Sequence, residues 1–102
     1  NPVTDGSTLT SSFLIQNYGN TAATDVVLTD TFSPAPNPIT VTVGGTALTD
    51  ADYDYTDGTL RLPGTESSYS LSVPAASFVQ NTETGEIAVN PGAVTIVVAG
   101  TL

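Results

Sequence analysis

Apolar and polar residues alternate along most of this chain, in short runs that turn-forming residues separate. In the run over residues 8–16, apolar side chains fall on one side and hydroxyl or amide side chains on the other: Leu9, Phe13 and Ile15 against Thr10, Ser12 and Gln16. A period of two is typical of a β-strand that buries one face, and no stretch keeps a helical period for three turns. The pattern therefore predicts a strand over residues 8–16 and an all-β chain.

A reversal of the chain is predicted directly after this strand, at residues 17–20. Gly19 and Asn20 both tolerate a positive φ, which a tight reversal requires. The next alternating run covers residues 23–29. We therefore expect the strands before and after this turn to pair as neighbours.

Two hairpins are predicted in the middle of the chain. Gly44-Gly45 follows an alternating run over residues 39–43, and Asp57-Gly58 joins the runs over residues 53–55 and 60–62. Both dipeptides favour a two-residue hairpin turn, and Asp57-Gly58 indicates type I′.

Prolines mark the predicted loops. The segment over residues 33–38 has three prolines in five residues, and it is predicted to be an extended loop that can cross between sheets, because proline cannot donate to a ladder. The alternating run over residues 69–73 is predicted to be a strand that Pro74 ends. Beyond it, Phe78 and Val79 lead into a turn at residues 81–85.

The final run, over residues 94–99, is apolar on nearly both sides. It predicts a strand that is buried deep in a sandwich or covered by a neighbour. Together these runs indicate an immunoglobulin-like antiparallel β-sandwich of about seven to nine strands, with a barrel as the alternative. The length of 102 residues fits one domain over residues 1–102. Because the chain begins without Met, we expect it to be one repeat or fragment of a longer protein.

Composition removes several classes of function. The chain has no His and no Cys, so it lacks an imidazole base, a thiolate nucleophile and the nitrogen and sulfur ligands that zinc, iron and copper use. Its formal net charge is −9 with Arg61 as the single cation, which makes nucleic acid and anionic membranes poor partners. No apolar run approaches the length of a membrane span. We expect neither catalysis nor membrane insertion.

Four aspartates form the one dense group of carboxylates. They are Asp50, Asp52, Asp54 and Asp57, and they are the candidate ligands for calcium, the one cofactor that we consider. The spacing is not that of an EF-hand, because Tyr55 stands where that loop needs Gly and Arg61 where it needs Glu. The alternative is an edge strand whose charges discourage aggregation.

The tyrosines and the arginine also allow a functional and a structural interpretation. Tyr18, Tyr53, Tyr55 and Tyr69 either stack on a sugar or cover the core, and packing is favoured because two of them alternate with aspartates. Arg61 lies across the predicted hairpin from the aspartates. We expect it to pair with Asp52 or Asp54.

One phrase carries a resemblance to a known family. Asn17 to Asp30 has the form Asn-x-Gly-Asn-x-x-Ala-x-x-Val-x-x-x-Asp, and nearly the whole chain resembles the bacterial conserved repeat domain, also called domain of unknown function eleven. The resemblance implies an Ig-like module that is repeated in extracellular proteins of the bacterial surface. It implies no catalytic residues. The intramolecular Lys-to-Asn isopeptide bond of some related domains cannot form within a chain that has no Lys.

Two functions stay open on this basis. The first is a structural module, a stalk repeat or a subunit of a self-assembling fibre, whose partners are adjacent repeats or neighbouring copies. The second is an adhesin-type module that binds a host protein or glycan through end loops, with binding residues that the sequence does not identify. For assembly by strand addition, residues 1–5 and 94–99 are the expected donors.

Overall fold

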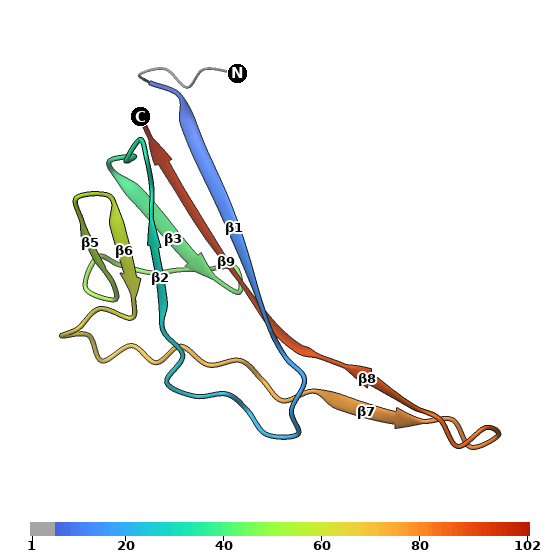
Figure 1. Cartoon of the computed structure of the whole chain (residues 1–102). Helices are drawn as coiled ribbons and strands as arrows, with labels where there is room; N and C mark the ends of the chain where they lie inside the picture. The colour runs from blue at the N-terminus through green and yellow to red at the C-terminus, as the bar shows by residue number, and fades with distance from the viewer. Residues whose placement is uncertain (1–5) are drawn as a thin grey trace.

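The computed structural model describes residues 6–102, and this part of the chain is all-β with antiparallel pairing throughout (Figure 1). The strands are β1 (Thr8–Asn17), β2 (Leu28–Thr31), β3 (Ile39–Val43), β4 (Thr46–Ala47), β5 (Asp54–Thr56), β6 (Thr59–Leu62), β7 (Ser77–Gln80), β8 (Ile87–Asn90) and β9 (Gly92–Thr101). The all-β prediction is therefore confirmed.

Two sheets face each other across one apolar core. The first has the order β1-β9-β3-β4 and the second the order β2-β6-β5. Buried side chains from both sheets meet between them, together with Leu71 from a connecting segment: Phe32, Val41, Leu60, Leu62, Leu71, Ile96 and Val98. The apolar side of β1 packs against the same core, as its alternation predicts.

The long central strand β9 organises the first sheet. It pairs with β1 over ten residues, from Thr8 opposite Thr101 to Asn17 opposite Gly92, and it pairs with β3 on its other side. Residues 94–99 all pair with β1, and residues 96–99 pair with β3 as well, so most of the run is covered by neighbours on both edges, as one of the two predicted arrangements required. The same pairing removes them as a donor strand for another chain, and the other expected donor, residues 1–5, lies outside the described residues.

The predicted pairing of β1 with the strand after it is wrong. β1 pairs with β9, whereas β2 belongs to the other sheet and pairs with β6. Neither Gly19 nor Asn20 adopts a positive φ. The segment after β1 instead crosses from one sheet to the other, so a tight reversal is not needed.

Both predicted hairpins are confirmed. The φ angles are 57° and 84° at Gly44 and Gly45, and 52° and 81° at Asp57 and Gly58. Each pair forms a two-residue loop, between Val43 and Thr46 and between Thr56 and Thr59. The proline segment is a loop that crosses between sheets, also as predicted.

Of two other predicted strands, the one over residues 23–29 is shorter than expected and the one over residues 69–73 is absent. β2 begins only at Leu28, because Asp25 takes a left-handed φ of 56° that interrupts an extended run. Residues 69–73 form no strand, although Leu71 and Val73 are buried. This segment makes an isolated bridge between Val73 and Ala23. The alternation of residues 69–73 therefore reflects which side chains are buried and does not indicate a strand.

The remaining hairpin, β7–β8, projects from the body of the molecule as an arm over residues 77–90 (Figure 1). The arm contributes to a long axis of 58 Å and a radius of gyration of 17.1 Å, where a compact chain of about 100 residues has about 13 Å. Leu102 hydrogen-bonds to Gly6 and Ser7. The ends of the described chain therefore lie together, at the opposite end from the arm.

Candidate functional site

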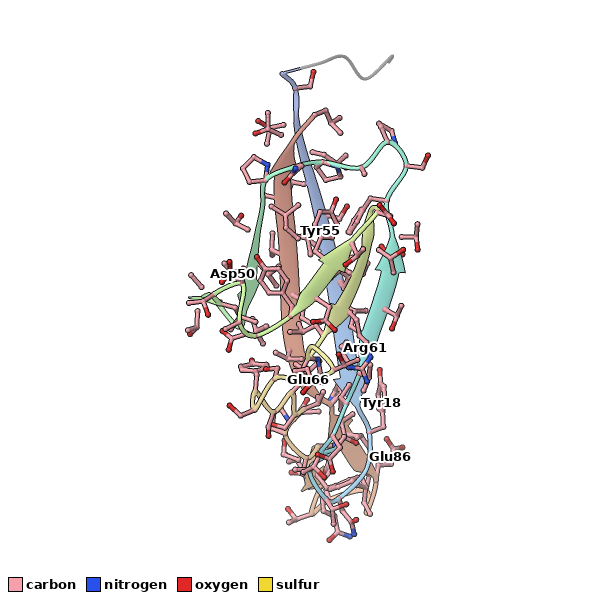
Figure 2. All side chains as sticks on the ribbon, turned by 90° about the vertical axis from the view of Figure 1, so that its left-hand side faces the viewer. Tyr18, Asp50, Tyr55, Arg61, Glu66 and Glu86 are labelled. Atoms are coloured by element: carbon pink, nitrogen blue, oxygen red, sulfur yellow. The ribbon has the colours of Figure 1, made fainter. Side chains whose placement is uncertain are left out.

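The four candidate aspartates do not converge on one point. Only Asp54 lies on a strand, at the start of β5, while Asp50 and Asp52 lie in the loop before it and Asp57 in the turn after it. Within residues 6–102, no group of three or more acidic side chains is placed to hold a metal ion. Figure 2 shows that the labelled carboxylates are spread along the molecule, with Asp50 at one margin and Glu86 in the arm.

Asp52 and Asp54 each bind protein groups instead. An Oδ2 atom of Asp52 accepts hydrogen bonds from the backbone N–H and the hydroxyl of Thr49, at 2.9 and 3.3 Å. Asp54 does the same with Thr65, at 2.8 and 3.0 Å. These two bonds, aided by the charge of Arg61, lower the pKa of Asp54. Asp52 therefore closes a turn within its own loop, whereas Asp54 fastens β5 to the segment after β6.

Arg61 has a structural environment. The register places Asp54 opposite it, and its charge helps to lower the pKa of that carboxylate, but the expected direct ion pair with Asp52 or Asp54 is not formed. Its Nη1 atom donates to the carbonyl of Pro63 at 2.7 Å. The guanidinium thus helps to hold the chain where it leaves β6.

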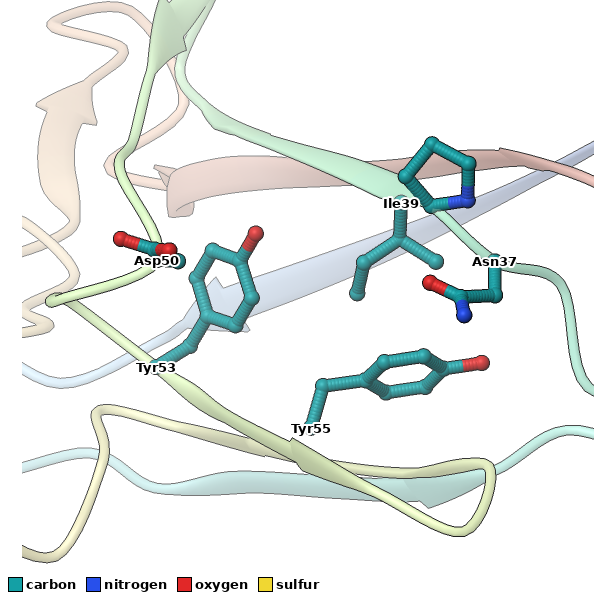
Figure 3. Close-up of a pocket in the computed structure, with 6 residues that line it drawn as sticks. Asn37, Ile39, Asp50, Tyr53 and Tyr55 are labelled. Atoms are coloured by element: carbon teal, nitrogen blue, oxygen red, sulfur yellow. The ribbon is translucent and has the colours of Figure 1, made fainter.

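Two tyrosines line the wall of a shallow hollow of about 340 Å³ (Figure 3). Tyr53 and Tyr55 face Asn37 and Ile39, and Asp50 lies at one end. Both rings also pack against the core, which confirms the packing interpretation for them. Burial raises the pKa of both phenols, and Asp50 adds to the effect at Tyr53. The Tyr55 hydroxyl donates to the carbonyl of Pro36, so its polar end already has a partner.

The other two tyrosines differ from each other. Tyr69 packs against the core, and its burial, followed by the charge of Asp52, raises its pKa. Tyr18 is exposed, and its hydroxyl donates to Gln16 at 3.4 Å. Tyr18 is therefore the tyrosine of the four that does not cover the core.

The largest feature that the sequence did not predict is an uncharged sheet. None of the residues in β1, β9, β3 and β4 is Asp, Glu, Lys or Arg. The outward side chains of β1 are polar and neutral except Leu14, which is 62% exposed. β1 is also an edge strand of this sheet. A long neutral edge of this kind is open to pairing with another strand.

The arm carries a group of exposed apolar side chains. All eight residues of β7 and β8 are exposed, and the register places Phe78 opposite Val89 and Gln80 opposite Ile87. Phe78, Val89 and Ile87 therefore share one face of a two-stranded ribbon. An isolated two-stranded ribbon is only marginally stable in water, so few interactions stabilise the arm.

Asn17 is a structural centre whose role the sequence did not reveal. Its Nδ2 atom donates to the carbonyls of Thr21 at 2.8 Å and Pro74 at 3.2 Å, and its Oδ1 atom accepts from the N–H of Gly19 at 2.9 Å. One side chain thus joins the end of β1 to two crossing segments. The Asn-x-Gly spacing signals the local bond to Gly19, but the distant contact has no local signal.

Comparison of the chain with family models, with curated proteins and with solved structures found no match. Within residues 6–102, no helix has the length and apolar character needed to cross a membrane.

Proposed function

We propose that this chain is a structural module of an extracellular bacterial surface protein, either a stalk repeat or a subunit of a self-assembling fibre or appendage. It performs no chemistry of its own. Its partners are adjacent repeats or neighbouring copies. The resemblance of residues 17–30 to the bacterial repeat domain supports the location and the Ig-like identity of the sandwich.

The observation that carries this proposal is the uncharged four-stranded sheet with its ten-residue edge. A chain with a formal net charge of −9 that leaves one whole sheet neutral has a surface on which copies can meet with the least repulsion. The absence of His, Cys and Lys supports a mechanical role, because imidazole bases, thiolate nucleophiles and amine nucleophiles are missing.

Electron microscopy of the full-length protein tests the proposal. Regular filaments support a fibre subunit, and a row of separate beads supports a stalk repeat. Isolated particles with neither arrangement contradict the proposal and favour a binding module.

The hollow beside Tyr53 and Tyr55 favours a second candidate, an adhesin-type module that binds a glycan. Tyrosine faces with a nearby amide and carboxylate suit a sugar, and Asn37 and Asp50 supply these groups. Binding on a glycan array that Asp50→Ala abolishes, and that Glu66→Ala leaves intact, supports this candidate. No binding above background on the array contradicts glycan recognition.

A further inference from the structure

The edges of the two facing sheets differ in how they are protected from pairing. In the smaller sheet, the edge strands β2 and β5 are short and carry Asp30 and Asp54. In the larger sheet, β4 has two residues, whereas β1 has ten and contains no charge, no proline and no glycine. Short length, charge and proline are the usual protections of an edge. β1 has none of them.

The backbone of β1 has hydrogen-bonding groups that point away from its sheet. The N–H of Leu102 donates to the carbonyl of Ser7 at 2.8 Å, and this bond fixes the alternation along β1. The backbone N–H and C=O groups of odd residues bond to β9, and those of even residues point away from β9 in the plane of the sheet. The bond from Gly44 to Thr95 agrees, because it shows that odd residues of β9 face β3. Within residues 6–102, no further backbone bond reaches the outward residues Thr8, Thr10, Ser12, Leu14 and Gln16.

We propose that this edge binds the β1 strand of a second copy, antiparallel, around a two-fold axis at Ser12. The inference rests on the proposed structural function and names its partner and surface. With Ser12 opposite Ser12 of the second copy, Thr10 faces Leu14 and Thr8 faces Gln16. Every outward N–H and C=O of these residues then has a partner, and the two four-stranded sheets become one continuous sheet.

The side chains agree with this register. On the core side, Leu9 of one copy faces Ile15 of the other, and both are half-buried residues at the margin of the core. On the outer side, the exposed Leu14 faces the methyl group of Thr10. Pairing thus covers apolar surface on both sides of the new sheet.

Charge selects this edge for self-association. Two copies with a formal net charge of −9 each repel each other at long range, and the repulsion is smallest where neutral strands meet. Since the contact itself has no ion pairs, added salt screens the repulsion and strengthens the dimer. Pairing through one strand buries little surface, so the dimer is weak and forms mainly at high protein concentration.

Cysteine cross-linking of the full 102-residue chain tests the register. The chain has no Cys, so Ser12→Cys introduces a single thiol at the two-fold axis. The Cα atoms of such a pair lie about 5.5 Å apart, within the range that a disulfide spans. The matched control is Thr40→Cys, on the exposed side of β3. Across the paired sheet its two copies lie about 24 Å apart, which is five strand spacings.

We expect Ser12→Cys to give a disulfide-linked dimer under mild oxidation, at a rate at least about tenfold above that of Thr40→Cys. Equal rates overturn the proposal. Sedimentation velocity of the unmodified chain gives the second test. We expect the dimer fraction to increase with the protein concentration and with the salt concentration. A monomer up to millimolar concentration in high salt also overturns it.

Ser12→Pro separates this inference from the general proposal. The Ser12 N–H points outward, so proline removes two hydrogen bonds of the dimer and none of the monomer, and the dissociation constant should rise roughly tenfold or more. Its circular dichroism should match that of the unmodified chain. If oligomers persist unchanged in folded Ser12→Pro, self-assembly stands but this edge is not its site. If the full-length protein also forms no filament or beads, the proposed function fails as well.

Discussion

The carbonyl oxygen of Pro74 lies directly over Gly92, 1.8 Å from the position that a Cβ atom on Gly92 would occupy. Gly92 is buried at the start of β9, where the chain enters the sheet from the arm. The obstructing atom belongs to the backbone, so it cannot rotate away as a side chain would. The crossing of these two segments therefore requires glycine.

Gly92→Ala is expected to destabilise the fold by about 3 kcal/mol or more, because the backbone must move to admit the methyl group. Urea denaturation measures the loss. The control is Gly19→Ala, where the nearest atom is the Oδ1 of the Asn17 side chain at 3.2 Å, and the expected change is within about 1 kcal/mol. Similar losses in the two variants would contradict the crossing described here.

Asn17→Asp is expected to destabilise the fold by about 1–3 kcal/mol. The aspartate keeps the acceptor for Gly19 but replaces the donor to Thr21 and Pro74 with a second acceptor. Thermal and urea unfolding report the effect. Asn90→Asp is the matched control, since Asn90 is exposed on β8, and it should change the stability by no more than about 0.5 kcal/mol. A neutral Asn17→Asp variant would show that the amide donor is not needed.

Stability should fall on the acid side partly through Asp54. Its folded-state pKa lies below its ordinary value because of its bonds to Thr65. A lowered carboxyl pKa gives stability that is present above about pH 4 and is lost as the pH falls through the folded pKa. Asp54→Asn should therefore flatten the acid limb of a plot of melting temperature against pH. Glu66→Gln is the comparison, and an unchanged limb in Asp54→Asn would refute the assignment.

On the alkaline side, the tyrosines should determine the loss of stability. Burial raises the folded-state pKa of Tyr55 and Tyr69, so the unfolded chain releases these protons first, near pH 10. Stability from this source is complete below about pH 10 and declines as the pH rises toward the folded pKa values. Tyr55→Phe should flatten this limb, as tyrosinate absorbance and melting temperature will show. A limb as steep as that of the unmodified chain would contradict this origin.

Calcium should leave the melting temperature unchanged at millimolar concentration. Asp52 and Asp54 already accept hydrogen bonds from Thr49 and Thr65. A ligand that binds the folded state raises the melting temperature, so calorimetry with calcium and with chelator measures the effect directly. A rise with calcium that Asp52→Asn removes would restore the aspartates as a metal site.

Features set by neighbouring residues could be predicted from the sequence. The Asp57-Gly58 and Gly44-Gly45 turns require a positive φ at both positions, and these residue pairs supply it locally. The alternation over residues 8–16 predicted which side of β1 packs against the core.

Features that depend on residues far apart in the chain could not be predicted from the sequence. The pairing of Thr8 with Thr101 joins opposite ends of the chain, and alternation does not identify a partner. Leu71 and Val73 alternate as in a strand and are buried, yet the chain there joins no sheet and makes only an isolated bridge to Ala23. The unprotected edge of β1 depends on which strand stands last in the sheet, so the sequence predicted its residues but not its position.

The separation of charge affects how the molecule orients beside a charged surface or polymer. Every carboxylate of residues 6–102 lies outside the sheet formed by β1, β9, β3 and β4. The module is therefore electrically two-sided, and a fixed anionic polymer exerts a torque on it. Beside such a polymer, the module should orient with its threonine-rich sheet facing the polymer and its acidic loops facing the surrounding water.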